Sequence, residues 1–357
     1  MTAHPYRDQP DYAFWSRAVS GRDAAALDPV VKAKFRLGRG DRVATAGSCF
    51  AQHIARFLTT SGFHYLVTED AHPFASRESA RRHGYGDFTA RFGNIYTARQ
   101  LVQLFDRAYG RFEPADDVWS GPNGRFVDPF RPRVEPGGFP TREALLADRR
   151  RHLACVRAMF ETLDVFVFTL GLTEAWISRE DGACYPLCPG VAGGRYDAAR
   201  HGFVNFGAAE VRADLEGFLA RLDEVNPGAR VILTVSPVPL VATAEDRHVL
   251  VSTTYSKAVL RVAAEEAAAA SPRVAYFPSY EIVAGTATRG AYFAEDGREV
   301  LEDGVEHVMR LFIGHYGSEA PRGAGPSEPS EADRMREDLA RMERLVRVNC
   351  DEVALEA

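Results

Sequence analysis

The chain has 357 residues, of which 46% are hydrophobic and 26% charged, and its formal net charge is −6. This composition is typical of a globular protein with enough apolar material for a core. The negative charge argues against nucleic acid as a partner, because proteins that bind its backbone usually carry a basic surface. No apolar run reaches the length of a membrane span, and the first residues lack the pattern of a secretory signal. We therefore expect a soluble, cytoplasmic protein.

Short apolar runs alternate with longer amphipathic segments along the chain. The runs expected to form strands are residues 42–46, 64–68, 164–169, 230–235 and 273–277. Because these runs are almost entirely apolar, we expect both faces of each strand to be buried. The helical segments between them include residues 208–225, whose apolar residues fall on one stripe. This alternation predicts a three-layer α/β/α fold with a doubly wound parallel sheet, and ligands at the carboxyl ends of its strands.

Residues 69–161 interrupt this alternation and are too long for a single crossover. The interval contains a helical pattern at 97–110, a loop rich in proline and glycine at 120–141, and the start of a further helix at 142–163. A long loop inside a compact domain usually has a function or is disordered, and the aromatic and arginine residues here favour order. We therefore interpret residues 69–161 as a cap-like insertion in a domain that covers residues 1–317.

The carboxyl-terminal part of the sequence has a different character. Residues 318–330 form a polar linker rich in glycine, proline and serine. Residues 331–357 are expected to form an amphipathic helix, with apolar side chains at heptad-like spacing at Met335, Leu339, Met342 and Val346. Such a helix can pack back on the domain or pair with a second copy, so a homodimer through this helix is left open.

Gly47 and Ser48 close the first predicted strand, and a helix begins directly after them. Ser48 therefore lies at the carboxyl end of the sheet, beside the positive end of the helix dipole. A serine in this place is either a nucleophile or only the N-cap of the helix. Cys49 is a second potential nucleophile, which we expect to point inward as a small core residue. The cysteines, five in number and without paired C-x-x-C spacing, indicate no metal site.

The residues from Gly47 to Ala51 read GSCFA, which resembles the name-giving motif of the GSCFA domain family, a relative of the SGNH/GDSL-like hydrolases. The similarity continues in one order through FGNIYTARQL, DPFRP, DVFVFTLGLTEAW, VILTVSPVPL, HVLVSTTYSKAVLR and YFPSYEIV. The resemblance implies an SGNH hydrolase-like fold with flavodoxin-like strand order. It also implies a serine nucleophile, which corresponds to Ser48, and an oxyanion hole made by the N–H of that serine, a glycine N–H and an asparagine side chain.

By this resemblance, Gly93 and Asn94 are the candidate oxyanion donors, with a simple turn as the alternative. The third family block, normally G-x-N-D, corresponds here to Gly171 through Glu174. Thr173 replaces the asparagine of that block, which weakens the match, although a hydroxyl can still donate one hydrogen bond.

The last family block is a D-x-x-H pair that supplies the catalytic base. Asp296 matches its aspartate, but Glu299 stands where the histidine is expected. A serine without a base is a poor nucleophile. We therefore consider two other histidines, His307, which is preferred because it lies in the same segment, and His248, which precedes the helix after the fourth strand.

The resemblance implies a serine esterase or O-acyl transferase that acts through a Ser48 acyl-enzyme on an acylated sugar, lipid or small molecule. That chemistry requires no metal or organic cofactor. The alternative is a non-catalytic module that binds a carbohydrate or a partner and has lost the D-x-x-H base. The altered third and last blocks favour this alternative, whereas the intact Gly47-Ser48 and Gly93-Asn94 pairs oppose it.

Overall fold

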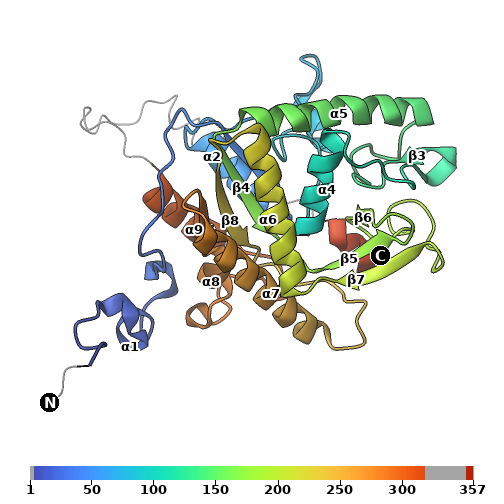
Figure 1. Cartoon of the computed structure of the whole chain (residues 1–357). Coiled ribbons are helices and arrows are strands. Elements are labelled where there is room, and N and C mark those ends of the chain that lie inside the picture. Colours follow the sequence, from blue (N-terminus) through green and yellow to red (C-terminus); the bar gives the residue numbers. More distant parts are fainter. Residues whose placement is uncertain (1–3, 318–350, 357) are drawn as a thin grey trace.

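The computed structural model describes residues 4–317 and 351–356 (Figure 1). The linker predicted at residues 318–330 and most of the helix predicted at 331–357 lie outside the described residues. Within the described end of the chain, Asp351–Glu356 form a short 3₁₀ helix. Figure 1 shows this end returning to the domain beside the small sheet that contains β5.

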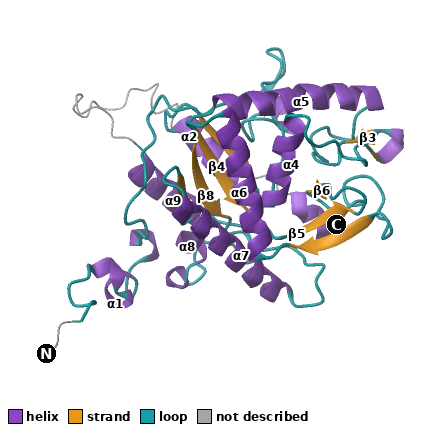
Figure 2. Ribbon diagram, in the orientation of Figure 1, coloured by secondary structure: helices purple, strands orange, loops and turns teal. Residues whose placement is uncertain are grey.

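A parallel sheet of four strands forms the centre of the fold (Figure 2). Its strands are β1 (Val43–Gly47), β4 (Val165–Leu170), β8 (Arg230–Val235) and β9 (Val274–Phe277), in the order β1-β4-β8-β9. The pairing is parallel throughout, with Val43 beside Val165 and Val165 beside Arg230. The doubly wound parallel sheet predicted from the sequence is confirmed.

The strand predicted at residues 64–68 is wrong. At this point the structure has one parallel bridge, between Val43 and Tyr65, on the free edge of β1. Two hydrogen bonds hold it: Val43 N donates to His64 O and Leu66 N donates to Val43 O, both at 2.9 Å. The chain then leaves β1, because Thr68 N donates to Thr89 O in the insertion. This bridge comes second in the sequence and lies at the edge of the sheet, beside β1. When it is counted with the four strands, the strand order is the flavodoxin-like order 2-1-3-4-5.

Helices cover both faces of the sheet because alternate strand residues point to opposite sides. On one face, Phe166, Phe168 and Leu233 pack against α4 (Ala98–Ala108), α5 (Arg142–Thr162), α6 (Ala208–Val225) and α7 (Val249–Ala270). On the other, Val167 and Ile232 pack against α2 (Ala51–Thr60), α8 (Ser279–Ala284) and α9 (Glu302–Tyr316). The two buried apolar layers predicted by the strand composition are therefore present.

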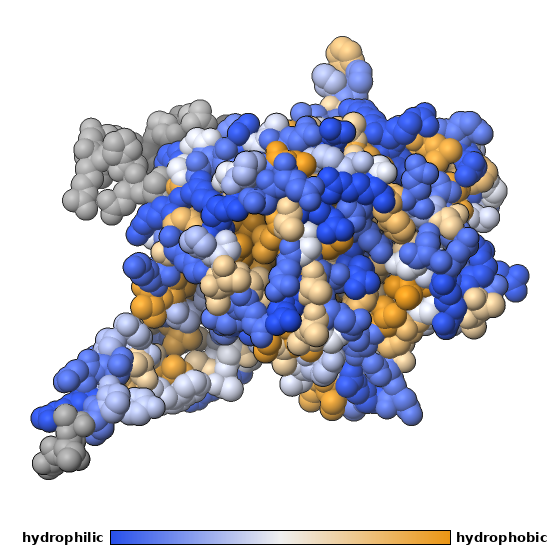
Figure 3. Space-filling model, viewed as in Figure 1, coloured by the Kyte–Doolittle hydropathy of each residue, from blue (hydrophilic) through white to orange (hydrophobic). Residues whose placement is uncertain are grey.

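The remaining elements are short. An antiparallel sheet of order β6-β5-β7 follows β4, and the insertion contains a small hairpin of β2 and β3 together with α3. Their bounds are α1 (Trp15–Ala18), α3 (Arg77–Arg82), β2 (Trp119–Ser120), β3 (Phe126–Val127), β5 (Glu174–Ser178), β6 (Cys184–Tyr185) and β7 (His201–Asn205). Figure 3 shows a mainly hydrophilic surface on the viewed face, with hydrophobic residues scattered over it. None of the described helices combines the length and apolar composition that a membrane span needs.

Candidate active site

Ser48 lies at the carboxyl end of β1, in the turn before α2. Its side chain is buried, and its hydroxyl has no hydrogen-bond partner among the described residues. The hydroxyl therefore does not cap α2, whose N-cap residue is Phe50. Because buried polar groups normally find a partner, an unsatisfied serine hydroxyl at this edge of the sheet is a feature that requires explanation.

Two glycines bring the backbone close to Ser48. Gly47 has φ +139°, and a Cβ at this position would lie 2.4 Å from the carbonyl oxygen of Thr169. A Cβ at Gly171, directly after β4, would lie 2.8 Å from the Cβ of Ser48. Both positions therefore exclude a larger residue, and Gly171 forms one wall of the space around Ser48. The backbone N–H of Ser48 donates to Thr169 O at 3.1 Å, so it is already engaged within the sheet.

Gly93 and Asn94 approach Ser48 from the insertion. Gly93 has φ +69°, which only glycine adopts without strain, and Ile95 N donates to Gly47 O at 2.8 Å. This contact holds the Gly93-Asn94 segment against the end of β1. Asn94 is buried, and its side-chain oxygen accepts a hydrogen bond from Gln52 Nε2 at 3.3 Å. Since Gln52 belongs to α2, the helix that follows Ser48 fixes the orientation of the Asn94 amide.

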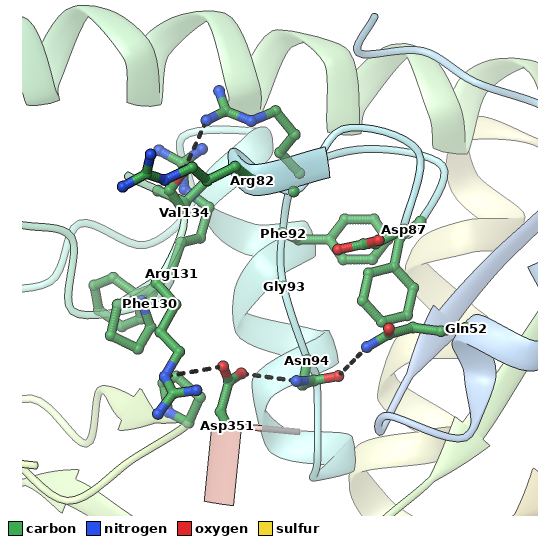
Figure 4. Close-up of a pocket in the computed structure, with 16 residues that line it drawn as sticks. Gln52, Arg82, Asp87, Phe92, Gly93, Asn94, Phe130, Arg131, Val134 and Asp351 are labelled. Carbon is green, nitrogen blue, oxygen red and sulfur yellow. Dashed lines mark hydrogen bonds and ion pairs between the residues drawn. The ribbon is translucent and has the colours of Figure 1, made fainter. Parts of the chain in front are cut away.

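Asp351, near the carboxyl terminus, occupies the space in front of Asn94. Its carboxylate accepts a hydrogen bond from Asn94 Nδ2 at 2.8 Å, as Figure 4 shows, and its backbone N–H donates to the Tyr96 hydroxyl at 3.2 Å. Burial raises the pKa of Asp351, although the side chain and backbone of Asn94 act against this shift. Asn94 Nδ2 thus donates to a carboxyl oxygen, which is the kind of contact that an oxyanion hole makes.

Lys257, on α7, is a buried cation at the same end of the sheet. Its Nζ donates to the carbonyl oxygen of Gly171 at 2.7 Å. Burial lowers the pKa of Lys257 to about 8, although the negative charge of Glu352 acts against this shift. Gly171 packs against Ser48 and accepts the hydrogen bond from Lys257. Gly171 is therefore the residue that connects Lys257 to the candidate nucleophile.

The third family block is only partly directed toward Ser48. Gly171 contacts Ser48 as described, but the Thr173 hydroxyl donates to Asn205 Oδ1 at 2.7 Å. Glu174 lies in β5 and its carboxylate accepts from the Thr243 hydroxyl at 2.6 Å. The described contacts of Thr173 and Glu174 therefore connect β5, β7 and the loop after β8.

The residues predicted to supply the base have contacts elsewhere. His307 is buried in α9, with Nδ1 2.8 Å from the Tyr292 hydroxyl and Nε2 2.8 Å from Leu27 O. His248 is exposed and caps α7, where its Nδ1 accepts from Leu250 N at 3.1 Å.

Asp296 and Glu299, the residues of the last family block, are both exposed. The Asp296 carboxylate accepts from the backbone N–H groups of Arg298 and Glu299, at 2.9 and 3.0 Å. This pattern is a turn stabilised by an aspartate. The contacts described above for Asp296, His307 and His248 are therefore all with residues other than Ser48.

Sequence reasoning missed Gln52, Lys257 and Asp351. Gln52 is four residues after Ser48 and therefore shares its end of α2, a spacing that could have revealed it. Lys257 is a charged residue in a long helix whose remaining buried positions are mainly small or apolar, which is a weaker signal. Asp351 is 257 residues away from Asn94, and no local pattern could have connected the two.

The model of the GSCFA family matches residues 42–312, which include Ser48, Asn94, Lys257 and the whole central sheet. No curated protein matches the sequence.

Three similar solved structures have low identity and low TM-scores. A carbohydrate esterase family 3 protein from Talaromyces cellulolyticus is 12% identical, with 76% of this chain and 94% of that chain covered and a TM-score of 0.35. An acetyl esterase mutant with an acetate ion is 11% identical, with coverage of 84% and 99% and a TM-score of 0.35. An Axe2 mutant, an acetyl-xylooligosaccharide esterase from Geobacillus Stearmophilus, is 13% identical, with coverage of 81% and 100% and a TM-score of 0.33.

TM-scores this low transfer neither substrate nor mechanism from those proteins. The match to the family model covers well over half of the chain, from β1 into α9. On this ground the chain belongs to the GSCFA family.

Proposed function

We propose that the protein is a serine esterase or O-acyl transferase that acts through an acyl-enzyme on Ser48. The observation that carries this proposal is the buried, unsatisfied Ser48 hydroxyl, next to Gly47, whose carbonyl holds the segment that contains Asn94; the Asn94 amide donates to the carboxyl group of Asp351. A nucleophile and an anion-binding donor on adjacent segments are the two groups that acyl transfer requires. Acylated sugars, lipids and small molecules are the substrate class proposed from the family resemblance.

In the proposed reaction, Ser48 Oγ attacks the carbonyl carbon of the ester, and its proton passes to a base. The carbonyl oxygen becomes an oxyanion, which the Asn94 side chain and the Gly93 N–H stabilise; Ser48 N–H is engaged by Thr169 and does not contribute. The alcohol then leaves with a proton, and Ser48 carries the acyl group. Water or a second alcohol attacks this ester in the second step and restores Ser48.

Three groups are candidates for the base. His307 and His248 are the residues proposed from the sequence, and each would have to give up its present contact to reach Ser48. Lys257 is the third candidate, because it is buried beside Gly171 and its pKa of about 8 leaves a useful fraction of neutral amine. Serine–lysine pairs are an established form of nucleophile activation.

A fluorophosphonate probe and a panel of short-chain 4-nitrophenyl esters test the proposal. The wild-type protein should hydrolyse the esters and be labelled, and Ser48→Ala should lose both properties. Cys49→Ala is the matched control at the neighbouring position and should retain them. Labelling that persists in Ser48→Ala and disappears in Cys49→Ala would assign the nucleophile to the thiol. Absence of both activity and labelling in the wild-type protein would favour a binding module instead.

A further inference from the structure

Two adjoining pockets lie next to Asn94, on the side of the insertion. The first, the Asp351 pocket, contains the Asp351 carboxylate and is lined by Arg82, Arg131 and Arg133 (Figure 4). The second, the His152 pocket, has Asn94 and Arg131 in common with the first and is also open to solvent. A ligand group that binds at Asn94 in one of these pockets therefore has the other pocket directly beside it.

Arg107, on α4, lines the His152 pocket and is a buried guanidinium. No carboxylate of the described residues forms an ion pair with it, and its guanidinium carbon lies 3.8 Å from the centre of the Phe130 ring. Burial lowers the pKa of Arg107 to about 9. The neighbouring Arg131 and Arg149 differ in this respect, because each contacts two carboxylates. Arg107 is thus a buried positive charge directed at a pocket.

Two further polar atoms in this pocket lack a hydrogen-bond partner among the described residues. They are Nη1 of Arg131 and Nε2 of His152, whose side chains are 2% and 1% exposed. Leaving such groups unsatisfied costs free energy. Both atoms belong to residues whose other polar atoms are held by ion pairs, so the side chains cannot simply turn toward another partner.

The contact with Glu69 fixes the tautomer of His152, while burial and the charge of Arg131 lower the pKa of the imidazole to about 4, although Glu69 acts against this shift. The distance between His152 Nδ1 and a Glu69 carboxylate oxygen is 2.7 Å, and the backbone N–H of Arg91 also donates to that carboxylate. Burial acts to raise the pKa of Glu69, but these contacts outweigh it and lower the pKa to about 2. Glu69 is therefore a carboxylate and Nδ1 carries the hydrogen. His152 Nε2 can then accept a hydrogen bond.

Asp351 shows that the adjoining pocket accepts a carboxylate. Its oxygen atoms lie 2.8 Å from Asn94 Nδ2 and 3.7 Å from Arg133 Nε. Guanidinium groups recognise carboxylates well because their planar N–H groups match the two oxygens. The His152 pocket offers two groups for the same purpose: Arg107, which has no ion pair among the described residues, and the unsatisfied Nη1 of Arg131, whose other nitrogens already contact Asp128 and Asp148.

We propose that the ester substrate carries a carboxylate, and that this group binds in the His152 pocket between Arg107 and Arg131. This inference rests on the proposed esterase function for the reaction, but the binding of the carboxylate can be measured separately. The preferred substrates would thus be acidic esters, such as monoesters of a dicarboxylic acid.

Two esters with the same leaving group test the substrate class. The wild-type protein should have a kcat/KM for mono-4-nitrophenyl succinate about 10- to 100-fold above that for 4-nitrophenyl acetate, the range expected for one charge-assisted contact. Arg107→Met, which keeps the aliphatic stem, should remove this preference and change the acetate rate less than about 2-fold. Arg111→Met, at the exposed Arg111 just beyond α4, is the matched control and should leave the preference intact. Equal rates for the two esters in the wild-type protein would overturn the proposal.

Succinate and succinamide provide a readout that needs no catalysis. Succinate should raise the melting temperature of the full chain, succinamide should not, and Arg107→Met should abolish the effect. Asp351→Ala should strengthen succinate binding, because it removes a competing carboxylate. Arg107-dependent succinate binding without any ester hydrolysis would reject the proposed reaction and retain this site. Ester hydrolysis with no preference for acidic esters and no succinate binding would reject the carboxylate site and retain the proposed reaction. These wild-type comparisons remain decisive even if Arg107→Met does not fold.

Discussion

The central sheet and the insertion bury polar groups in opposite ways. The interior of the sheet is apolar on both faces, and polar side chains such as Ser48, Thr169 and Lys257 gather at the carboxyl ends of its strands. In the insertion, charged residues lie inside: Asp128 is completely buried and contacts both Arg131 and Arg149. Ser48, Thr169 and Lys257 have no opposite charge in direct contact among the described residues, whereas Asp128 of the insertion forms ion pairs with two arginines.

This difference separates groups that serve chemistry from groups that serve folding. A buried group without a full partner costs stability, so its presence at a strand end indicates a role in binding or reaction. A buried ion pair is costly to break because the remaining charge has no compensation. Substitutions at the sheet end should therefore change activity more than stability, and substitutions of the buried pairs should do the opposite.

The largest effect is expected for Lys257→Met, which tests the sheet end. If Lys257 accepts the proton of Ser48, this change should slow acylation by about 10²- to 10⁴-fold, the usual contribution of a general base. Stability should stay equal or rise, because a charge whose burial is unfavourable is removed. The wild-type rate should increase with pH through about 8, as the amine loses its proton. Single-turnover acylation and urea unfolding would measure the two quantities.

His307→Gln and His248→Gln are the comparisons for that experiment. His307→Gln should lower stability through its contacts with Tyr292 and Leu27, and His248→Gln should remove a helix cap. A loss of acylation rate in either variant that equals the loss in Lys257→Met would return the role of base to that histidine.

The second prediction breaks a buried pair in the insertion. Asp128→Asn should lower the free energy of unfolding by about 3–5 kcal/mol, because Arg131 and Arg149 would remain buried with less opposite charge. Asp223→Asn is the matched control, since Asp223 forms an exposed ion pair with Arg273 and should change stability by about 1 kcal/mol or less. Urea unfolding measures both. Equal, small effects would show that the insertion is held by its apolar contacts alone.

The two regions also differ in how well the sequence predicts them. The strands follow from apolar runs, such as residues 164–169, because a strand buried on both faces needs an apolar composition. The buried pairing of Asp128 with Arg131 and Arg149 cannot be predicted from composition. One aspartate and two arginines in a loop and a helix are found on protein surfaces as readily as in an interior. The predicted strand at 64–68 failed because periodicity does not show where the chain departs from the sheet edge.

The site shows the same division. Short motifs and their resemblance to a family pattern predict Ser48, Gly93 and Asn94 as site residues, and the structure brings their two segments together at the carboxyl end of β1. The base could not be predicted in this way, because Glu299 replaces the expected histidine. The sequence also does not distinguish a histidine that reacts from one, such as His307, that supports the fold. Only the three-dimensional contacts show that His307 is satisfied by a hydroxyl and a carbonyl.

The third prediction sharpens the comparison through pH. Because the pKa of Glu69 is lowered from 4.5 to about 2 in the folded protein, its ionised form stabilises the fold above about pH 4.5. This stabilisation, about 3 kcal/mol by the size of the shift, is lost as the pH falls from about 4.5 toward 2. The wild-type protein should therefore lose more stability over that range than Glu69→Gln does. Parallel loss in the two proteins would mean that the Glu69–His152 pair does not contribute.

The smallest effect is expected where the carboxyl terminus meets the sheet end. Asp351 and Glu352 are both buried. Asp351 contacts Asn94, and a Glu352 carboxylate oxygen lies 3.8 Å from Arg298 Nη2. If Asn94 is the oxyanion donor proposed above, the Asp351 carboxyl group occupies the position that the oxyanion needs and must compete with the substrate. Deletion of residues 351–357, or Asp351→Ala in the full chain, should raise the rate of fluorophosphonate labelling of Ser48 by about 3- to 10-fold, equivalent to roughly 1 kcal/mol.

The exposed Leu355 provides the control, because Leu355→Ala alters the same segment without touching Asn94 and should leave the rate unchanged. The alternative is that Asp351 completes the site by orienting the Asn94 amide, just as Gln52 does from the other side. In that case Asp351→Ala should slow labelling, and Asp351→Asn, which can still accept the hydrogen bond, should restore it. A carboxylate that competes with substrate and one that orients a donor thus predict opposite signs. The comparison of Ala and Asn at residue 351 therefore decides whether this buried acid belongs with the paired charges of the insertion or with the reactive groups of the sheet.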